Sequence, residues 1–216
     1  MASKAIKLVL STCTSAVLLL SCADVPSTGP QPPEVLSEFR FVHAAPELGS
    51  VQLAVDGVSQ GDLTYSNTLG YKSFPAGSRE VSLSNGEKQF VAMSTDLRGT
   101  VAVLPSIAGA AREFFRISER RIFDTPGVAV RVLNFSPNYS VDVRVIAGTD
   151  TVANARLAFK GDTGYRVVTA RDYVVEVKEA GTDVVLATSP LTVSNSHTAL
   201  IMGGAGAVTI KSLADH

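Results

Sequence analysis

Cys22 is the residue of this 216-residue chain whose position points most directly to chemistry. It follows an apolar run at positions 8–20, which itself follows a basic start with two lysines and no acidic residue. A basic segment, a short apolar segment and a small residue at the boundary are typical of a secretory signal peptide. The apolar run is also shorter than the roughly 20 residues of a membrane-spanning helix. Residues 1–21 are therefore predicted to be a signal peptide.

The boundary itself, Leu19-Leu20-Ser21-Cys22, resembles the lipobox of bacterial lipoproteins. The resemblance implies that the sulfur of Cys22, a strong nucleophile, receives a diacylglycerol thioether and that the chain is cut before it. The alternative is a free or buried cysteine that happens to end a signal sequence. Cys13 would leave with the signal peptide, so the mature chain could form neither an internal disulfide nor a cysteine zinc site. Ala23 favours the outer membrane, although Asp24 leaves the destination open in some lineages.

The expected partner of such an anchor is the membrane, and the expected location is the cell envelope, at the periplasmic face of the outer membrane or the cell surface. Residues 22–37 follow as a segment with four prolines among Ser, Thr and Gly. Proline fixes φ and disfavours helix, so this segment is predicted to be an extended, semi-rigid tether.

From Phe39 onward, short alternating apolar segments are bounded by Gly, Pro, Asn or Asp. This pattern is typical of β-strands, and the segments around Asn85-Gly86 and 178–185 are predicted to be hairpin turns. Residues 107–115 are the one stretch that suggests a helix, although their alternation suits a strand equally well. At 45% hydrophobic residues the composition indicates a globular chain. The fold is predicted to be all-β.

The strand pattern occurs twice, with a period of about ninety residues, so each copy is expected to bury its own core as a sandwich of about seven strands. The predicted domains are 38–124 (repeat 1) and 125–216 (repeat 2). The alignment pairs Arg40 with Arg131, His43 with Asn134, Pro46 with Pro137, Val51 with Val141, Gly70-Tyr71 with Gly164-Tyr165, and Ala76 with Ala170.

Three segments of repeat 1 resemble a bacterial family known as domain of unknown function 4397. They are Arg40 to Pro46, Val51 to Gly57 and Gly70 to Gly77. Repeat 2 departs from the pattern, with Asn134 in place of the histidine and a different sequence at 170–172. The resemblance implies tandem immunoglobulin-like or transthyretin-like antiparallel β-sandwiches, often secreted, lipid-anchored and duplicated, with no shared reaction.

Other candidate residues indicate little chemistry. His43, His197 and His216 lack the spacing of metal ligands, and no catalytic residue, metal site or cofactor is predicted. Gly203 to Ala207 lacks the lysine of a phosphate-binding loop and is interpreted as a turn at a strand end. The basic stretch Arg112 to Arg121 could contact anionic lipid, but a strand with a solvated arginine face is favoured. A net charge of −1 provides no field that would attract nucleic acid.

We therefore expect a lipid-anchored, non-catalytic envelope module for adhesion, scaffolding or binding, whose partner is an envelope or extracellular protein or a glycan. The absence of tryptophan disfavours a lectin. The alternative is a hydrolase or a small-ligand carrier with its site in the loops or between the domains. A deep pocket in which His43 or His197 lies beside a carboxylate and a serine would favour the enzyme.

The lipobox predicts that Cys22→Ser abolishes labelling by a radioactive or clickable fatty acid and leaves unprocessed precursor, because neither lipid transfer nor cleavage can follow. Immunoblotting and membrane fractionation check this. Normal-sized mature protein held in the membrane fraction of the mutant would overturn the assignment.

The duplication predicts that the chain divides near Thr125-Pro126-Gly127. Expressed separately, Glu38 to Asp124 and Thr125 to His216 should each unfold cooperatively in a denaturant titration. The prediction fails if the two fragments fold only when they are joined.

Overall fold

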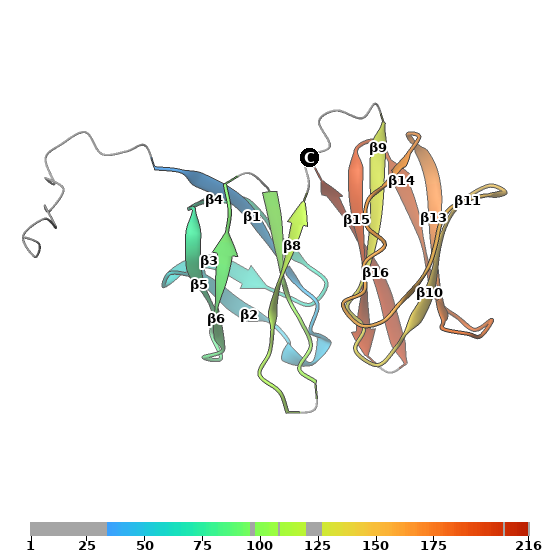
Figure 1. Ribbon diagram of the computed structural model, residues 1–216. Coiled ribbons are helices and arrows are strands. Elements are labelled where there is room, and N and C mark those ends of the chain that lie inside the picture. The colour runs from blue at the N-terminus through green and yellow to red at the C-terminus, as the bar shows by residue number, and fades with distance from the viewer. Residues whose placement is uncertain (1–33, 96–97, 108, 120–126, 205, 216) are drawn as a thin grey trace, which may run out of the picture. The chain divides into compact units, whose positions relative to one another are not determined.

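The computed structural model describes residues 34–95, 98–107, 109–119, 127–204 and 206–215. The predicted signal peptide, Cys22 and nearly all of the tether lie outside these residues. The described part of the chain is all-β, as predicted, with four four-stranded sheets that form two sandwich-like domains (Figure 1). Among the described residues, no helix is both long and apolar enough to span a membrane.

Repeat 1 contains two sheets, with strand orders β4-β1-β7-β8 and β3-β2-β5-β6, and one short 3-10 helix. Its elements are β1 (Leu36–His43), η1 (Pro46–Leu48), β2 (Val51–Val55), β3 (Val58–Leu63), β4 (Thr68–Pro75), β5 (Gly77–Leu83), β6 (Lys88–Met93), β7 (Arg98–Val103) and β8 (Phe114–Glu119).

Repeat 2 has the same arrangement, with strand orders β12-β9-β15-β16 and β11-β10-β13-β14. Its strands are β9 (Val128–Asn134), β10 (Val141–Ala147), β11 (Asp150–Leu157), β12 (Arg166–Val168), β13 (Arg171–Glu179), β14 (Val185–Val193), β15 (Ser196–Gly204) and β16 (Ala207–Asp215).

The two repeats also share their strand register. In repeat 1, β1 runs parallel to β7 and pairs Arg40 with Thr100. In repeat 2, β9 runs parallel to β15 and pairs Arg131 with Thr198. The remaining pairings within the sheets are antiparallel. The tandem duplication predicted from the sequence is therefore present in the fold.

Several element boundaries differ from the sequence expectation. β1 begins at Leu36 rather than at residue 38, because the Ala76 amide bonds to the Val35 carbonyl and the Ser37 hydroxyl bonds to the Phe74 carbonyl. Residues 109–113 carry no helix, and β8 follows at Phe114. Of the two segments that look loop-like in sequence, 148–154 falls largely within β11, whereas only the first three residues of 61–67 belong to β3. Both are edge strands, so their side chains are mostly polar or exposed and lack a clean apolar alternation.

Each sandwich buries its own core between its two sheets. In β10, buried and partly exposed residues alternate along the whole strand, which is the pattern of a sheet with one face packed and one face toward solvent. The core of repeat 1 includes Phe39, Phe41 and Leu53, and that of repeat 2 includes Val143, Val175 and Ile201.

A third core is shared between the repeats. β1, β7, β9 and β15 are buried on both faces, which explains why their sequences are nearly continuously apolar. The faces that point away from each sandwich core pack together as one cluster. Its members occur as equivalent pairs: Val42 and Leu133, Ala44 and Phe135, Ala102 and Leu200, Leu104 and Met202, Ile117 and Leu213.

The shared core has a consequence for the two fragments. Residues 35–216 form one compact unit, and either fragment alone would expose its half of this apolar cluster to water, at about 25 cal/mol per Å². Whether each fragment folds alone remains a prediction. The segment in which the division was predicted, 120–126, lies outside the described residues.

Candidate functional site

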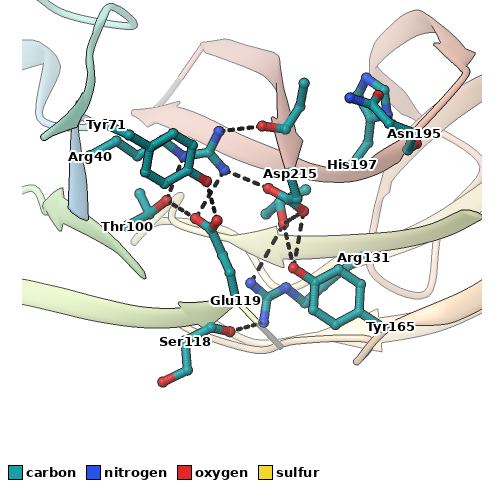
Figure 2. A network of polar contacts seen from close by, with 12 residues as sticks. Arg40, Tyr71, Thr100, Ser118, Glu119, Arg131, Tyr165, Asn195, His197 and Asp215 are labelled. Carbon is teal, nitrogen blue, oxygen red and sulfur yellow. Dashed lines mark hydrogen bonds and ion pairs between the residues drawn. The ribbon is translucent and has the colours of Figure 1, made fainter. Parts of the chain in front are cut away.

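A buried network of charged groups lies at one end of the shared interface (Figure 2). Arg40 is 5% exposed, and its Nε donates to the Thr100 hydroxyl at 2.7 Å. Its Nη2 contacts the Glu119 carboxylate of the same repeat at 3.0 Å and the Asp215 carboxylate of the other repeat at 2.5 Å. Thr100 and Tyr71 both donate hydrogen bonds to Glu119. One arginine therefore neutralises carboxylates from both repeats.

Repeat 2 builds the equivalent set from Arg131, Thr198, Asp215 and Tyr165. The hydroxyls of Thr198 and Tyr165 donate to Asp215 at 2.6 and 3.0 Å. The Arg131 guanidinium lies over the Tyr165 ring, 4.4 Å from its centre. This arginine is bonded less completely than Arg40, because its buried Nε has no hydrogen-bond partner among the described residues.

The two arginines reach across the interface reciprocally. Nη1 of Arg40 donates to the carbonyl of Ala214 at 2.6 Å, and Nη1 of Arg131 donates to the carbonyl of Ser118 at 3.1 Å. Ser118 and Ala214 occupy equivalent positions, each preceding the acidic residue of its strand. Equivalent residues that contact each other reciprocally define an isologous interface, here within one chain.

This network acts as a structural clamp and presents no reactive group. Burial, as the largest cause, raises the pKa of Tyr71 and of Tyr165 far above the ordinary value, so both phenols stay protonated and act as donors. Both arginines and both carboxylates are at most 6% exposed. A buried charge is tolerated only when it is paired and hydrogen-bonded. Arg40 meets this condition with Glu119 and Asp215, whereas Arg131 lies 3.7 Å from the Asp162 carboxylate and is satisfied less completely.

A cleft of about 450 Å³ lies at the other end of the interface. The strands β1, β7, β9 and β15, which pass from the polar network through the shared core, lead to this cleft, which is lined by the end of β15 and by residues that follow β1, β7 and β9. Both repeats contribute corresponding residues to its lining. Pro46 and Glu47 of repeat 1 correspond to Pro137 and Asn138 of repeat 2, and Pro105 and Ser106 correspond to Gly203 and Gly204. Ile107 is the remaining lining residue.

Gly203 shows why the sequence at 203–207 is rich in glycine. Its φ is +117°, and a Cβ placed there would lie 2.0 Å from the Ala207 carbonyl oxygen. A side chain would therefore prevent β15 from pairing closely with β16. Gly204 ends β15 and Ala207 begins the antiparallel β16, as the interpretation of a turn at a strand end requires, and Gly203 and Gly204 line the cleft.

The Glu47 carboxylate is held in place at the edge of the cleft. Its Oε1 accepts hydrogen bonds from the Ser106 amide at 2.9 Å and from Nη1 of Arg112 at 2.6 Å. No hydrogen bond from another described residue to Oε2 is found, and the backbone amide of Glu47 also bonds to its own carboxylate. Burial acts to raise the pKa of this carboxyl, but the hydrogen bonds from Arg112 and the Ser106 backbone outweigh it and lower the pKa below its ordinary value. Glu47 is therefore a positioned anion at neutral pH.

Arg112 does not fit the predicted solvated arginine face. Its side chain is only 6% exposed and lies between Glu47 and Glu87, with a further hydrogen bond from Nη1 to the Leu104 carbonyl at 3.0 Å. The strand predicted in this basic stretch is present as β8, but it ends in the buried Glu119. Arg120 and Arg121 lie outside the described residues. Arg112 is thus an interior counter-ion for two acidic residues distant in sequence, whereas Arg116 is only partly buried and donates to the Ala92 carbonyl and the Ser118 hydroxyl.

His43 and Asn134 occupy equivalent places and make equivalent hydrogen bonds. His43 is fully buried; its Nδ1 accepts from the Ala45 amide at 3.1 Å, and its Nε2 lies 2.8 Å from the Gly49 carbonyl. Asn134 accepts from the amide two residues later, at 2.9 Å, and donates to the Tyr139 carbonyl at 2.8 Å. Both side chains pin a strand end to the loop that follows it.

The histidines are not assembled into a catalytic group in the described part of the chain. Neither His43 nor His197 lines the cleft. His197 lies at the polar-network end of β15, with Nδ1 2.8 Å from the Asn195 carbonyl. His216 is outside the described residues, within which no three His, Cys, Asp or Glu side chains are grouped to hold a metal ion.

Sequence reasoning missed Glu47, Asn138 and the pair Glu119 and Asp215. One signal was present, because the repeat alignment that pairs Thr100 with Thr198 also pairs the two acidic residues that end β8 and β16. Nothing in the local sequence indicates that Glu47 and Asn138 lie at the same cleft, since more than ninety residues separate them.

We expect Arg40→Met to reduce the free energy of unfolding by about 3–5 kcal/mol, because it leaves two buried carboxylates without their shared cation. Lys88→Met is the matched control. It removes a lysine whose side chain is 62% exposed and whose pairing with Glu80 should contribute about 0–1 kcal/mol. Urea titration of both variants measures the difference. Equal losses would show that the clamp does not hold the two repeats together.

His43→Asn should fold and cost little stability, because repeat 2 uses that residue at the same place, whereas His43→Leu should cost about 1–3 kcal/mol of unfolding free energy.

Burial lowers the pKa of His43 below its ordinary value of 6.5. The unfolded chain therefore takes up the proton first, and wild-type stability should fall as the pH drops below that value. His43→Asn should lack this part of the decline in thermal melts between pH 8 and 5. If the wild type proves to hydrolyse a substrate and His43→Asn removes that activity without lowering the melting temperature, His43 is instead catalytic.

Comparison with known proteins identifies no family for this chain. No family model matches it, so the resemblance to domain of unknown function 4397 stays a prediction, and no curated protein matches either. Solved structures with distant similarity include family 41 carbohydrate-binding modules from streptococcal virulence factors, studied for alpha-glucan recognition. The sequence identity is 10% and the TM-score is 0.30, and the match covers 81% of this chain and 96% of that chain. A second is a multi-modular glycogen-degrading pneumococcal virulence factor, at 13% identity and a TM-score of 0.29, covering 81% of this chain and 21% of that one. A third, described as alpha-glucan binding by a streptococcal virulence factor, has 13% identity and a TM-score of 0.26, covering 81% and 96%. At such TM-scores, what those proteins bind is not carried over to this chain.

Proposed function

We propose that this protein is a non-catalytic binding module of the bacterial cell envelope, lipid-anchored through Cys22, which holds its ligand in the cleft between the two repeats. The observation that carries the proposal is the construction of the cleft. Corresponding loops from both repeats meet there, at the end of an interface fixed by a buried clamp and an apolar core. A volume of about 450 Å³ lies within the range of small-ligand sites.

The polar groups of the cleft support binding rather than catalysis. The Ser106 hydroxyl donates to the Ala110 carbonyl at 2.8 Å, and the Glu47 carboxylate is engaged by Arg112. The carboxylate beside Ser106, that of Glu47, accepts from the Ser106 backbone amide and not from its hydroxyl, and neither described histidine lines the cleft. The hydrolase alternative therefore gains no support from this site.

A lipid anchor followed by a proline-rich tether suits a module that must hold its ligand at a distance from the bilayer. Multiple acyl chains give stable anchoring, and an extended proline-rich segment separates the folded repeats from the membrane. The anchor, the outer-membrane location and an envelope partner are parts of the proposal that rest on the sequence.

The test is a co-sedimentation experiment with purified cell-wall sacculi and envelope fragments. The mature chain, with Cys22→Ser to keep it free of lipid, is compared with the same chain carrying Ser106→Trp, which places a large ring at the cleft. Ser59→Trp, at an exposed position of β3, is the control. We expect the wild type and the control to sediment with the envelope material and the cleft variant to stay in solution. Equal retention of all three at equal melting temperature would exclude the cleft as the binding site.

A further inference from the structure

At one pair of corresponding cleft positions, the two repeats carry side chains of different charge. Glu47 and Asn138 each follow the proline that ends the first strand region of their repeat, and both are exposed at the cleft. Repeat 1 thus supplies a carboxylate where repeat 2 supplies an amide. Among the described residues, no other residue is found to hydrogen-bond to Oε2 of Glu47 or to the Asn138 side chain, although the backbone amide of Glu47 also bonds to its own carboxylate. Both groups offer free acceptor oxygens to a ligand.

The local charge is negative and is not cancelled within the cleft. Glu47 and Glu87 share the single guanidinium of Arg112, at 2.6 and 2.8 Å, which leaves one excess negative charge. Arg112 cannot turn toward a ligand, because its side chain is almost buried and is also bonded to the Leu104 carbonyl. The nearby Lys160 is paired with Glu113. An anionic ligand would meet no free cation from these residues.

The walls around these oxygens are apolar. Pro46, Pro105 and Pro137 line the cleft, and Ile107 is 44% exposed there. No aromatic ring lines the cleft, so the flat stacking platform that many sugar-binding sites use is missing from its lining. A carboxylate set among proline and isoleucine surfaces matches a ligand that combines a cationic donor with an aliphatic chain.

Building on the proposed function, we infer that the cleft binds a primary ammonium group carried on an aliphatic chain, with Glu47 as its counter-ion and Asn138 as a second acceptor. Two sources share this chemistry, a lysine side chain of a peptide and a free aliphatic diamine. In both, the ammonium donates to Oε2 of Glu47 while the methylene chain lies along the proline walls.

The probes are N-acetyl-lysine-methylamide for the peptide source and 1,5-diaminopentane for the free diamine. Their neutral counterparts, N-acetyl-norleucine-methylamide and 1,5-pentanediol, keep the aliphatic chain and lack the charge. Binding to the mature Cys22→Ser chain is followed by NMR, through the amide signals of Ser106, Ile107 and Gly204. We expect saturable shifts with the cationic probes, with dissociation constants of roughly millimolar size for ligands this small, and no saturation with the neutral ones.

The tighter of the two cationic probes identifies the source. Glu47→Gln should weaken its binding about tenfold, since a charge-assisted hydrogen bond is lost. Glu80→Gln is the matched control and should change nothing, because Glu80 pairs with Lys88 on the surface, away from the cleft lining. Asn138→Asp should strengthen binding, because it places a carboxylate on the repeat 2 side as well. This gain keeps the test decisive even if Glu47→Gln disturbs the Ser106 loop.

The inference falls if the neutral probes bind as well as the cationic ones, or if Glu47→Gln and Asn138→Asp leave the dissociation constant unchanged. It falls separately from the proposed function. If Ser106→Trp abolishes envelope binding while no cationic probe shifts the cleft amides, the cleft is the binding site for a ligand of another class. If Ser106→Trp has no effect and the probes do not bind, both ideas fail.

Discussion

The ion pair between Arg40 and Asp215 joins the two ends of the described chain, and the arrangement of the repeats depends on it. A guanidinium from the first strand of repeat 1 is bonded to a carboxylate and a carbonyl from the last strand of repeat 2. These groups are buried, so a shift of one repeat against the other would leave charges without partners in a region of low dielectric constant. Such a shift costs several kcal/mol, far more than sliding an apolar surface alone. The shared apolar cluster supplies most of the attraction between the two repeats, and Arg40 fixes the position of one repeat relative to the other.

The position of the cleft follows from this constraint. β1 and β7 in repeat 1, and β9 and β15 in repeat 2, lead from the polar network through the shared core to the loops at the other end. Once the arginines fix one end of these strands, the lengths of the strands determine where the prolines, Glu47 and Asn138 come to lie. The walls of the cleft, which come from both repeats, are then held as rigidly as the strands that carry them.

Duplication explains which residues are shared and which have diverged. The arginine, threonine, acidic residue and tyrosine of the clamp occur in both repeats, because each side of an isologous contact has to satisfy the same groups. His43 and Asn134 differ in type yet make the same pair of hydrogen bonds, so either side chain meets the structural requirement. Glu47 and Asn138 have no such requirement in common. Their difference gives the cleft an asymmetric distribution of charge.

Much of the fold could be predicted from the sequence by local physical rules. The alternating apolar residues of β10 and β13 predict half-buried strands, Asn85-Gly86 predicts the hairpin between β5 and β6, and the repeated Arg, Pro and Gly-Tyr positions predict two similar sandwiches. Edge strands such as β3 and β11 are harder to predict. Few of their residues are buried in the core, so their sequences lack a strict alternation of apolar and polar residues. The lipobox at Cys22 is likewise a local pattern, and it carries the expectation of an anchor.

By itself, then, the sequence determined the class of fold, the duplication and the candidate lipid anchor. The fold class and the anchor rest on residues that are close together in the chain, and the duplication rests on two similar local patterns. Only the tertiary structure decided which charges meet. Arg40 lies 175 positions before Asp215, and Glu47 lies 65 positions before Arg112. No local pattern encodes such pairs, because their contact depends on how two complete sandwiches pack against each other. For the same physical reason, Arg112, which belongs to a stretch predicted to have a solvated arginine face, is a buried counter-ion, and a cleft lies where no motif indicated one.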